Sequence, residues 1–302
     1  MPGWLVTGGS GFLGHHILRA VADPAREVIA LGRTCPPGWS AENFVRADLE
    51  DWSALSEAVS SIAPEVVIHA AGRTPPAEAG ALHRANTLAT LNLLEALNQQ
   101  RVRTQVVLVG SAAELGPVAG EDLPVGEDYA CRPVDAYARS KWMATTAGLA
   151  AWPALRVIVA RVFNPIGPGL PISQAFGRFA EALAGAGRGP VRIVAGNLEA
   201  RRDFIDARDA ADALVALALR GRGGEIYHVG TGCSRPVGDG LDLLIRLSGR
   251  VVEVEEVARP GACPSDSRAD IRKIREGTGW SPRIGWEQSL ADLWEAAIAR
   301  AD

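Results

Sequence analysis

The chain has 302 residues, of which 47% are hydrophobic and 22% are charged, as is ordinary for a globular protein. Its formal net charge of −4 at pH 7 argues against a nucleic-acid partner. No apolar run approaches the roughly 20 residues of a membrane span, and the four cysteines are far apart, which favours reduced thiols over disulfides or a metal site. We therefore expect a cytoplasmic protein with no signal peptide, membrane partner or bound metal.

A glycine-rich turn follows the first expected strand, residues 3–7, and leads into a helix expected over 12–22. In such a strand–turn–helix context the glycine spacing indicates a dinucleotide site. The backbone N–H groups of the turn can approach a pyrophosphate, and the helix N-terminus offers unpaired donors and the positive end of its dipole. We expect five residues of this segment to contact the cofactor: Gly8, Gly11, Phe12, Leu13 and Gly14.

The end of the second expected strand, 27–31, bears on which cofactor is bound. Arg33 lies about 20 positions beyond the glycines, with no acidic residue beside it in the sequence. A guanidinium suits the 2′-phosphate of NADP(H), whereas a carboxylate there would bind the ribose hydroxyl of NAD. We therefore favour NADP(H), with NAD(H) as the alternative cofactor and a solvated loop arginine as the alternative interpretation of Arg33.

Further strands expected at 44–46, 66–69 and 105–109 alternate with helices at 51–62 and 82–97. This alternation predicts an α/β protein, a Rossmann-like doubly wound parallel sheet with helices on both faces. Ligands of such sheets lie beyond the carboxyl ends of the strands. The expected cofactor contacts there are Asp48, Leu49, Ala70, Ala71 and Gly72, whereas His69 is expected to be a core histidine with satisfied hydrogen bonds.

Tyr137 and Lys141 lie four residues apart on a helix expected to begin near Asp135, so they share one helical face. An ammonium beside a phenol favours the phenolate, so we expect a lowered Tyr137 pKa. Such a pair can pass a proton to or from an alcohol or carbonyl oxygen, and Ser111 at the end of the preceding strand can hold the same oxygen. Ser111, Tyr137 and Lys141 are the candidate catalytic residues, and Tyr137 and Lys141 are also expected to contact the cofactor.

Motifs along essentially the whole chain together resemble the extended short-chain dehydrogenase/reductases that act on nucleotide sugars, the NAD-dependent epimerase/dehydratase family. They are residues 7–14, 69–72, 110–116, Tyr137 with Lys141, 161–168, 202–206, 259–261 and 269–273. The resemblance implies hydride transfer at a sugar carbon, with Ser111, Tyr137 and Lys141 handling the proton. It also implies that Asn164 contacts the sugar or its diphosphate and that Arg202 and Arg259 hold the diphosphate. For either arginine, a surface salt bridge is the alternative.

The same resemblance implies how the chain is divided into domains. Residues 1–165 would form the dinucleotide-binding domain, to which 203–230 return, while 166–202 and 231–302 would form a smaller α/β substrate-binding domain. The helices expected at 82–97 and 137–151 carry apolar residues on more than one face. Since family members pair through a four-helix bundle of these helices, we expect a homodimer.

The residues after Ser111 narrow the chemistry within the family. Ala112 and Ala113 stand where sugar 4,6-dehydratases have an Asp–Glu pair, and neither a cysteine in 110–116 nor a histidine in 170–179 is present for 3,5-epimerisation. Two chemistries remain: NADP(H)-dependent reduction of a nucleotide-linked 4-keto-6-deoxy sugar, and 4-epimerisation with tightly bound NAD.

Residues 196–209 and 224–230 are similar to GDP-6-deoxy-D-mannose reductases, and Arg33 also favours the reductase. A non-catalytic NADP(H)-binding sensor is the hypothesis from another class. The nucleobase of the sugar nucleotide stays open at this point.

Overall fold

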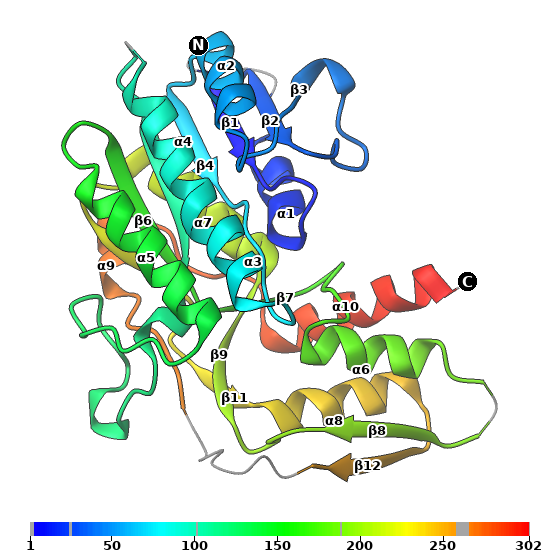
Figure 1. Ribbon diagram of the computed structural model, residues 1–302. Coiled ribbons are helices and arrows are strands. Elements are labelled where there is room, and N and C mark those ends of the chain that lie inside the picture. The colour runs from blue at the N-terminus through cyan, green and yellow to red at the C-terminus, as the bar shows by residue number, and fades with distance from the viewer. Residues whose placement is uncertain (1–2, 24–25, 101, 188, 258–265, 302) are drawn as a thin grey trace.

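The computed structural model describes residues 3–23, 26–100, 102–187, 189–257 and 266–301 (Figure 1). Its main sheet has seven parallel strands in the order β10-β6-β5-β4-β1-β2-β3. These strands are β1 (Trp4–Thr7), β2 (Val28–Gly32), β3 (Phe44–Arg46), β4 (Val66–His69), β5 (Gln105–Ser111), β6 (Arg156–Val162) and β10 (Ile226–Val229). The strand order reverses at β1, and a ligand of a doubly wound sheet binds at such a reversal.

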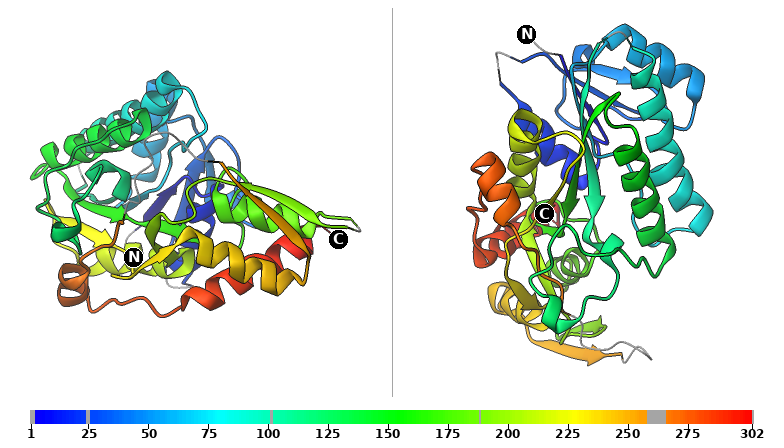
Figure 2. Two further views of the ribbon diagram at one scale, coloured as in Figure 1. Left: turned by 90° about the horizontal axis from the view of Figure 1, so that it is seen from below. Right: turned by 90° about the vertical axis from the view of Figure 1, so that its left-hand side faces the viewer.

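Helices cover both faces of this sheet, because its central strands are apolar along nearly their whole length. One face packs against α1 (Phe12–Val21), α7 (Ala207–Arg220) and α9 (Arg272–Thr278). The other packs against α2 (Trp52–Ile62), α4 (Ala89–Asn98) and α5 (Ala136–Ala150), and the two layers are separated by the sheet in the right-hand view of Figure 2. The α/β doubly wound fold expected from the sequence is confirmed.

Local sequence signals set several helix starts. The carboxylates of Asp51 and Asp135 accept backbone N–H groups in the first turns of α2 and α5, at 3.2 and 2.8 Å. The helix expected as one piece over 82–97 is instead three consecutive segments: α3 (Ala79–His83), a π-helical turn (Arg84–Leu88) and α4. Short 3₁₀ turns lie at Ala41–Asn43, Ala112–Leu115 and Gly120–Asp122.

A second group of elements lies below the main sheet in Figure 1. It contains the strands β7 (Asn164–Ile166), β8 (Val191–Ala195), β9 (Arg201–Asp206), β11 (Ser234–Pro236) and β12 (Val252–Glu256). Its helices are α6 (Ala175–Ala184), α8 (Val237–Ser248) and α10 (Trp286–Ala301), which share one apolar core. The domain boundaries stay a prediction. Within the segment 231–302, α9 lies against α7 and β10 and its Ile274 belongs to the core of the main sheet.

Within the described ranges, no helix combines the length and the apolar character that a membrane crossing requires. The same residues contain no group of three His, Cys, Asp or Glu side chains placed to bind a metal. Cys35, Cys131 and Cys233 are free thiols, and Cys263 lies outside the described residues.

Candidate active site

The glycine turn brings three segments into direct backbone contact. Gly8 has a φ of +76°, and a Cβ there would lie 2.5 Å from the Ala71 nitrogen, while a Cβ on Gly14 would lie 1.9 Å from the Gly8 oxygen. Only glycine fits at these two positions. The N-cap of α1 is Gly11, which has no side chain to cap the first N–H groups of the helix. Those groups are therefore available to an anion.

Two neighbouring cavities of about 450 and 280 Å³ lie at this edge of the sheet and share the turn and residues 70–73. Every residue that the sequence predicts as a cofactor contact lines one or both of them. They are Gly8, Gly11, Phe12, Leu13, Gly14, Arg33, Asp48, Leu49, Ala70, Ala71, Gly72, Tyr137 and Lys141. The structure thus brings the whole predicted set together, and its contact with a cofactor stays a prediction.

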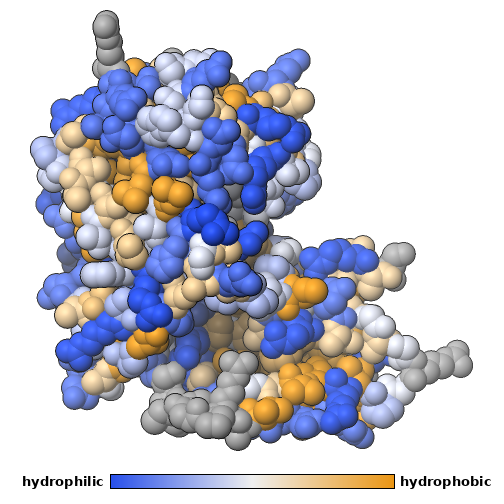
Figure 3. Space-filling view, in the orientation of Figure 1, coloured by the Kyte–Doolittle hydropathy of each residue, from blue (hydrophilic) through white to orange (hydrophobic). Residues whose placement is uncertain are grey.

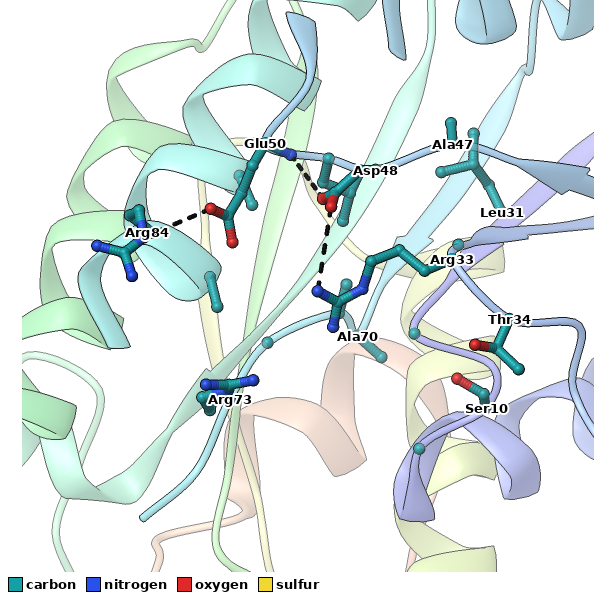
Figure 4. A pocket seen from close by; sticks show the side chains of 18 of the residues that line it. Ser10, Leu31, Arg33, Thr34, Ala47, Asp48, Glu50, Ala70, Arg73 and Arg84 are labelled. Atoms are coloured by element: carbon teal, nitrogen blue, oxygen red, sulfur yellow. Dashed lines mark hydrogen bonds and ion pairs between the residues drawn. The ribbon is translucent and has the colours of Figure 1, made fainter. Parts of the chain in front are cut away.

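The larger cavity carries charged side chains at its mouth (Figure 4). Arg33 Nη1 lies 4.0 Å from Asp48 Oδ2, and the two side chains are 69% and 43% exposed. The sequence has no acidic residue beside Arg33, but the fold places the Asp48 carboxylate there. The parallel pairing of β2 with β3 sets Gly32 beside Arg46, so the residues after the two strands meet at one edge.

Sequence reasoning missed three further charged residues of this cavity, Glu50, Arg73 and Arg84. Arg84 Nε lies 3.6 Å from Glu50 Oε2 across the cavity from Arg33 (Figure 4). Arg73 directly follows the small residues 70–72 at the end of β4, and that position was an available signal. No signal in the sequence pointed to Arg84, because an arginine on a helix is usually a solvated residue.

His69 is the core histidine that the sequence predicts. Its Nδ1 lies 2.7 Å from the Thr7 hydroxyl and its Nε2 lies 3.0 Å from the Thr90 hydroxyl. Burial lowers its pKa to about 3, with a smaller contribution from Lys141. The ring is neutral at physiological pH and serves as a link between β4, β1 and α4.

Ser111, Tyr137 and Lys141 line the smaller cavity together. Lys141 Nζ donates to the Val109 carbonyl at 2.5 Å, and burial lowers the pKa of this ammonium. The Tyr137 pKa is raised by burial, with a hydrogen bond from Ser111 acting in the opposite direction. The expected lowering of the Tyr137 pKa is therefore wrong for this structure, because desolvation of the phenolate outweighs the groups that favour it.

A third cavity of about 530 Å³ adjoins these residues and is lined by Ser111, Tyr137, Asn164 and Arg202. Asn164 Nδ2 donates to the Asp203 carbonyl at 3.0 Å. Burial lowers the pKa of Arg202, against the opposing effect of Asp266. Of the predicted substrate contacts the structure brings together these three, Ser111, Asn164 and Arg202, while Arg259 lies outside the described residues.

The 280 and 530 Å³ cavities adjoin and share six lining residues: Thr74, Ser111, Tyr137, Val162, Pro165 and Gln174. Ser111 and Tyr137 line both the 280 Å³ cavity, which contains the glycine turn, and the 530 Å³ cavity, which contains Asn164 and Arg202. A carbonyl or alcohol bound between the cavities can therefore contact a proton donor and a hydrogen-bonding hydroxyl at once.

Comparison with known proteins identifies relatives over nearly the full chain. Residues 4–230 match the family described as the NAD dependent epimerase/dehydratase family. The chain is 32% identical to the GDP-6-deoxy-D-mannose reductase of Pseudomonas aeruginosa, with 97% of each sequence covered. It is 30% identical to the dTDP-6-deoxy-L-talose 4-dehydrogenase (NAD(P)(+)) of Kitasatospora kifunensis, over 96% of this chain and 94% of that one.

A solved structure shows the same fold. RMD from Pseudomonas aeruginosa, complexed with NADPH, superimposes with a TM-score of 0.86 and 29% identity, over 99% of this chain and 100% of that one.

Proposed function

Because the chain belongs to the NAD dependent epimerase/dehydratase family, we propose that it reduces a nucleotide-linked 4-keto-6-deoxy sugar with NADPH. The family and an NAD(P)-dependent enzyme, both predicted from the sequence, are confirmed by the comparisons. The observation that carries the proposal is the pair Ser111 and Tyr137, which lines both the cavity of the glycine turn and the cavity of Asn164 and Arg202.

The protonation state of Tyr137 supports reduction. Its raised pKa keeps the phenol protonated at neutral pH, which is the form a proton donor needs. When bound, the reduced nicotinamide supplies a hydride to C4. Tyr137 gives its proton to the C4 oxygen, so that the carbonyl becomes an alcohol, and Ser111 donates a hydrogen bond to the same oxygen. Lys141, one helical turn away, stabilises the phenolate that is left.

The two ends of the site have separate binding roles in this proposal. The glycine turn and the start of α1 hold the cofactor pyrophosphate through backbone N–H groups. Arg33 binds the 2′-phosphate, and this preference is supported by the NADPH bound to RMD. Asn164, Arg202 and Arg259 hold the sugar and its diphosphate.

One observation favours 4-epimerisation with tightly bound NAD as a second candidate. Asp48 lies at the mouth of the same cavity as Arg33, and a carboxylate there suits the ribose hydroxyls of NAD. Purified protein that already carries NAD would favour this candidate. The sensor hypothesis finds no support, because Ser111, Tyr137 and Lys141 lie together at one cavity.

The decisive experiment follows the loss of reduced-nicotinamide absorbance with NADPH and then NADH. GDP-linked and dTDP-linked 4-keto-6-deoxy sugars are offered in turn, since relatives of both kinds are found. Consumption of one equivalent of NADPH per ketose supports the reductase and identifies its nucleotide. If neither ketose is reduced, 4-epimerisation becomes the favoured function, and the next measurement is whether the purified protein carries NAD.

Tyr137→Phe distinguishes catalysis from cofactor binding alone. Because it removes the proton donor and leaves the ring, we expect kcat to fall by about 10²–10⁴-fold. The Kd for NADPH, measured by nicotinamide fluorescence, should stay close to that of the parent protein. Turnover at the parent rate would contradict the assigned role of Tyr137.

Exposed apolar side chains support the expected homodimer. Leu88, Leu91, Trp142 and Met143 are each at least 40% exposed, and hydrophobic residues gather over α4 and α5 in Figure 3. We propose that these helices pair with those of a second copy in a four-helix bundle. A monomeric mass by light scattering would contradict the proposal.

A further inference from the structure

A buried ion pair lies directly behind the candidate catalytic residues. Glu114, in the 3₁₀ turn that follows β5, is 0% exposed, and Arg161 on β6 is 1% exposed. Glu114 Oε2 accepts hydrogen bonds from Arg161 Nε and Nη2, both at 3.3 Å. Neither residue lines the cavities described above, so this pair is not placed to contact a ligand.

The carboxylate of Glu114 instead holds the backbone of Ser111. Its Oε1 accepts the Ser111 N–H at 2.7 Å, and the Ser111 hydroxyl accepts the Ala113 N–H at 3.2 Å. The two bonds form a reciprocal capping box at the start of the 3₁₀ turn. Ser111 is therefore fixed both through its backbone and through its side chain, and it lines the same two cavities as Tyr137, whose pKa it lowers.

Further contacts keep the arginine in place. Arg161 Nη1 lies 3.2 Å from His228 Nε2, and Arg161 Nη2 donates to Cys131 Sγ at 3.2 Å. His228 Nδ1 lies 3.0 Å from the Val125 carbonyl, so the ring donates there and accepts from Arg161. Burial lowers the pKa of His228 to about 3, which keeps the ring neutral and able to accept.

We propose that Glu114 is a positioning residue: its buried carboxylate, held by Arg161, fixes Ser111 so that the serine hydroxyl meets the Tyr137 oxygen. This inference rests on the proposed function, in which both hydroxyls contact the C4 oxygen. A buried ion pair adds little stability over apolar residues of similar size, so its place beside Ser111 is explained by the geometry it imposes.

Two double variants separate positioning from simple stability. E114Q/R161M and E114L/R161M both replace the ion pair by uncharged side chains, but only glutamine keeps an acceptor for the Ser111 N–H. We expect E114Q/R161M to keep kcat within a few-fold of the parent and E114L/R161M to lose about 10²-fold, as for a small displacement of a catalytic group. The Kd for NADPH should be similar in both. Equal kcat values would overturn the proposal.

A second measurement needs no substrate and so stays informative if the proposed reductase activity is absent. The chain has three tyrosines, so ¹³C-tyrosine labelling gives three NMR signals, and Y137F identifies that of Tyr137. The hydrogen bond from Ser111 lowers the Tyr137 pKa. We therefore expect a higher Tyr137 pKa in E114L/R161M than in E114Q/R161M. The charge environment is the same in both: Lys141 and Asp135 remain, and the Glu114 and Arg161 charges are gone.

Gly110→Ala tests the same contact with both charges retained. A Cβ at this position would lie 2.7 Å from Glu114 Oε1, so the carboxylate must move away from Ser111. We expect a lower kcat and a raised Tyr137 pKa, even if the double variants fail to fold. An unchanged kcat together with an unchanged Tyr137 pKa would contradict the proposal.

Asp209→Asn is the matched control for loss of a buried carboxylate. Asp209 is 2% exposed and accepts the N–H groups of Arg283 and Ile284 at 2.9 and 2.8 Å, and it lines none of the three cavities. The control should lower stability without changing kcat or the Tyr137 pKa. If it lowers kcat as E114L/R161M does, the effect at Glu114 is only structural and the proposal fails.

Discussion

Two arginine–carboxylate pairs near the candidate site differ in almost every physical respect. Arg33 and Asp48 lie 4.0 Å apart at the mouth of the 450 Å³ cavity and are 69% and 43% exposed. Arg161 and Glu114 lie 3.3 Å apart in the interior and are 1% and 0% exposed.

Water and salt screen an exposed ion pair and make it weak. Each of its two charged groups can therefore leave its partner and bind a ligand instead. The two members of a buried ion pair must stay together, because a single unpaired charge in the interior strongly destabilises the fold. Charged side chains at the mouth of a cavity are therefore suited to binding a ligand, and paired charges in the interior are suited to holding neighbouring residues in place.

We expect the pH dependence of the free energy of unfolding to come more from buried groups of the interior than from the exposed pair at the mouth. His69 and His228 have pKa values of about 3 against an ordinary 6.5, so the unfolded chain binds more protons between these values. Stability is therefore fully present above pH 6.5 and is lost as the pH falls toward 3, by about 1.4 kcal/mol per pH unit for each histidine.

Urea unfolding at several pH values in this window measures the loss. Because burial raises the pKa of carboxylates such as Asp203, which act in the opposite direction, the comparison is made with H228Q. This variant should show a slope smaller by about 1.4 kcal/mol per pH unit. Identical slopes for the two proteins would contradict the placement of His228 beside Arg161 as a neutral buried ring.

Removing one partner of each pair tests the contrast in stability directly. Arg161→Met leaves the Glu114 carboxylate buried and unpaired, so we expect the free energy of unfolding to fall by about 3–5 kcal/mol. Arg33→Met should change it by less than about 1 kcal/mol. Urea unfolding at pH 7 measures both, and E114Q/R161M should recover most of the loss. Equal losses for the two single variants would erase the distinction between the pairs.

We expect the exposed pair at the mouth to affect which cofactor, NADPH or NADH, is bound more tightly. Arg33→Met removes a guanidinium proposed to bind the 2′-phosphate. Since a charge-assisted hydrogen bond contributes about 1.5–3 kcal/mol, we expect the Kd for NADPH to rise about 10–100-fold. The Kd for NADH should stay unchanged.

Arg84→Met, across the same cavity (Figure 4), is the control for loss of one positive charge and should affect the two cofactors alike. Equal weakening of NADPH and NADH binding by Arg33→Met would show that Arg33 does not discriminate between them.

Local patterns made much of the site predictable. The glycine turn, the alternation of strands and helices, and the four-residue spacing of Tyr137 and Lys141 each depend on neighbours in sequence. They led to the correct fold, and to a set of predicted cofactor contacts that all line the two adjoining cavities. His69 could also be assigned to the core, since a single histidine at the end of an apolar strand is usually buried and hydrogen-bonded.

The sequence by itself thus determined the α/β architecture and the family, and it indicated a candidate site at the carboxyl edge of the sheet. Only the tertiary structure set Asp48 beside Arg33, through the pairing of β2 with β3, and Glu114 against Arg161, which are 47 residues apart. It also decided the direction of the Tyr137 pKa, which rises where the sequence predicted a fall. The physical reason is common to all three: long-range pairing and desolvation depend on which segments the folded chain brings together, and no local spacing encodes them.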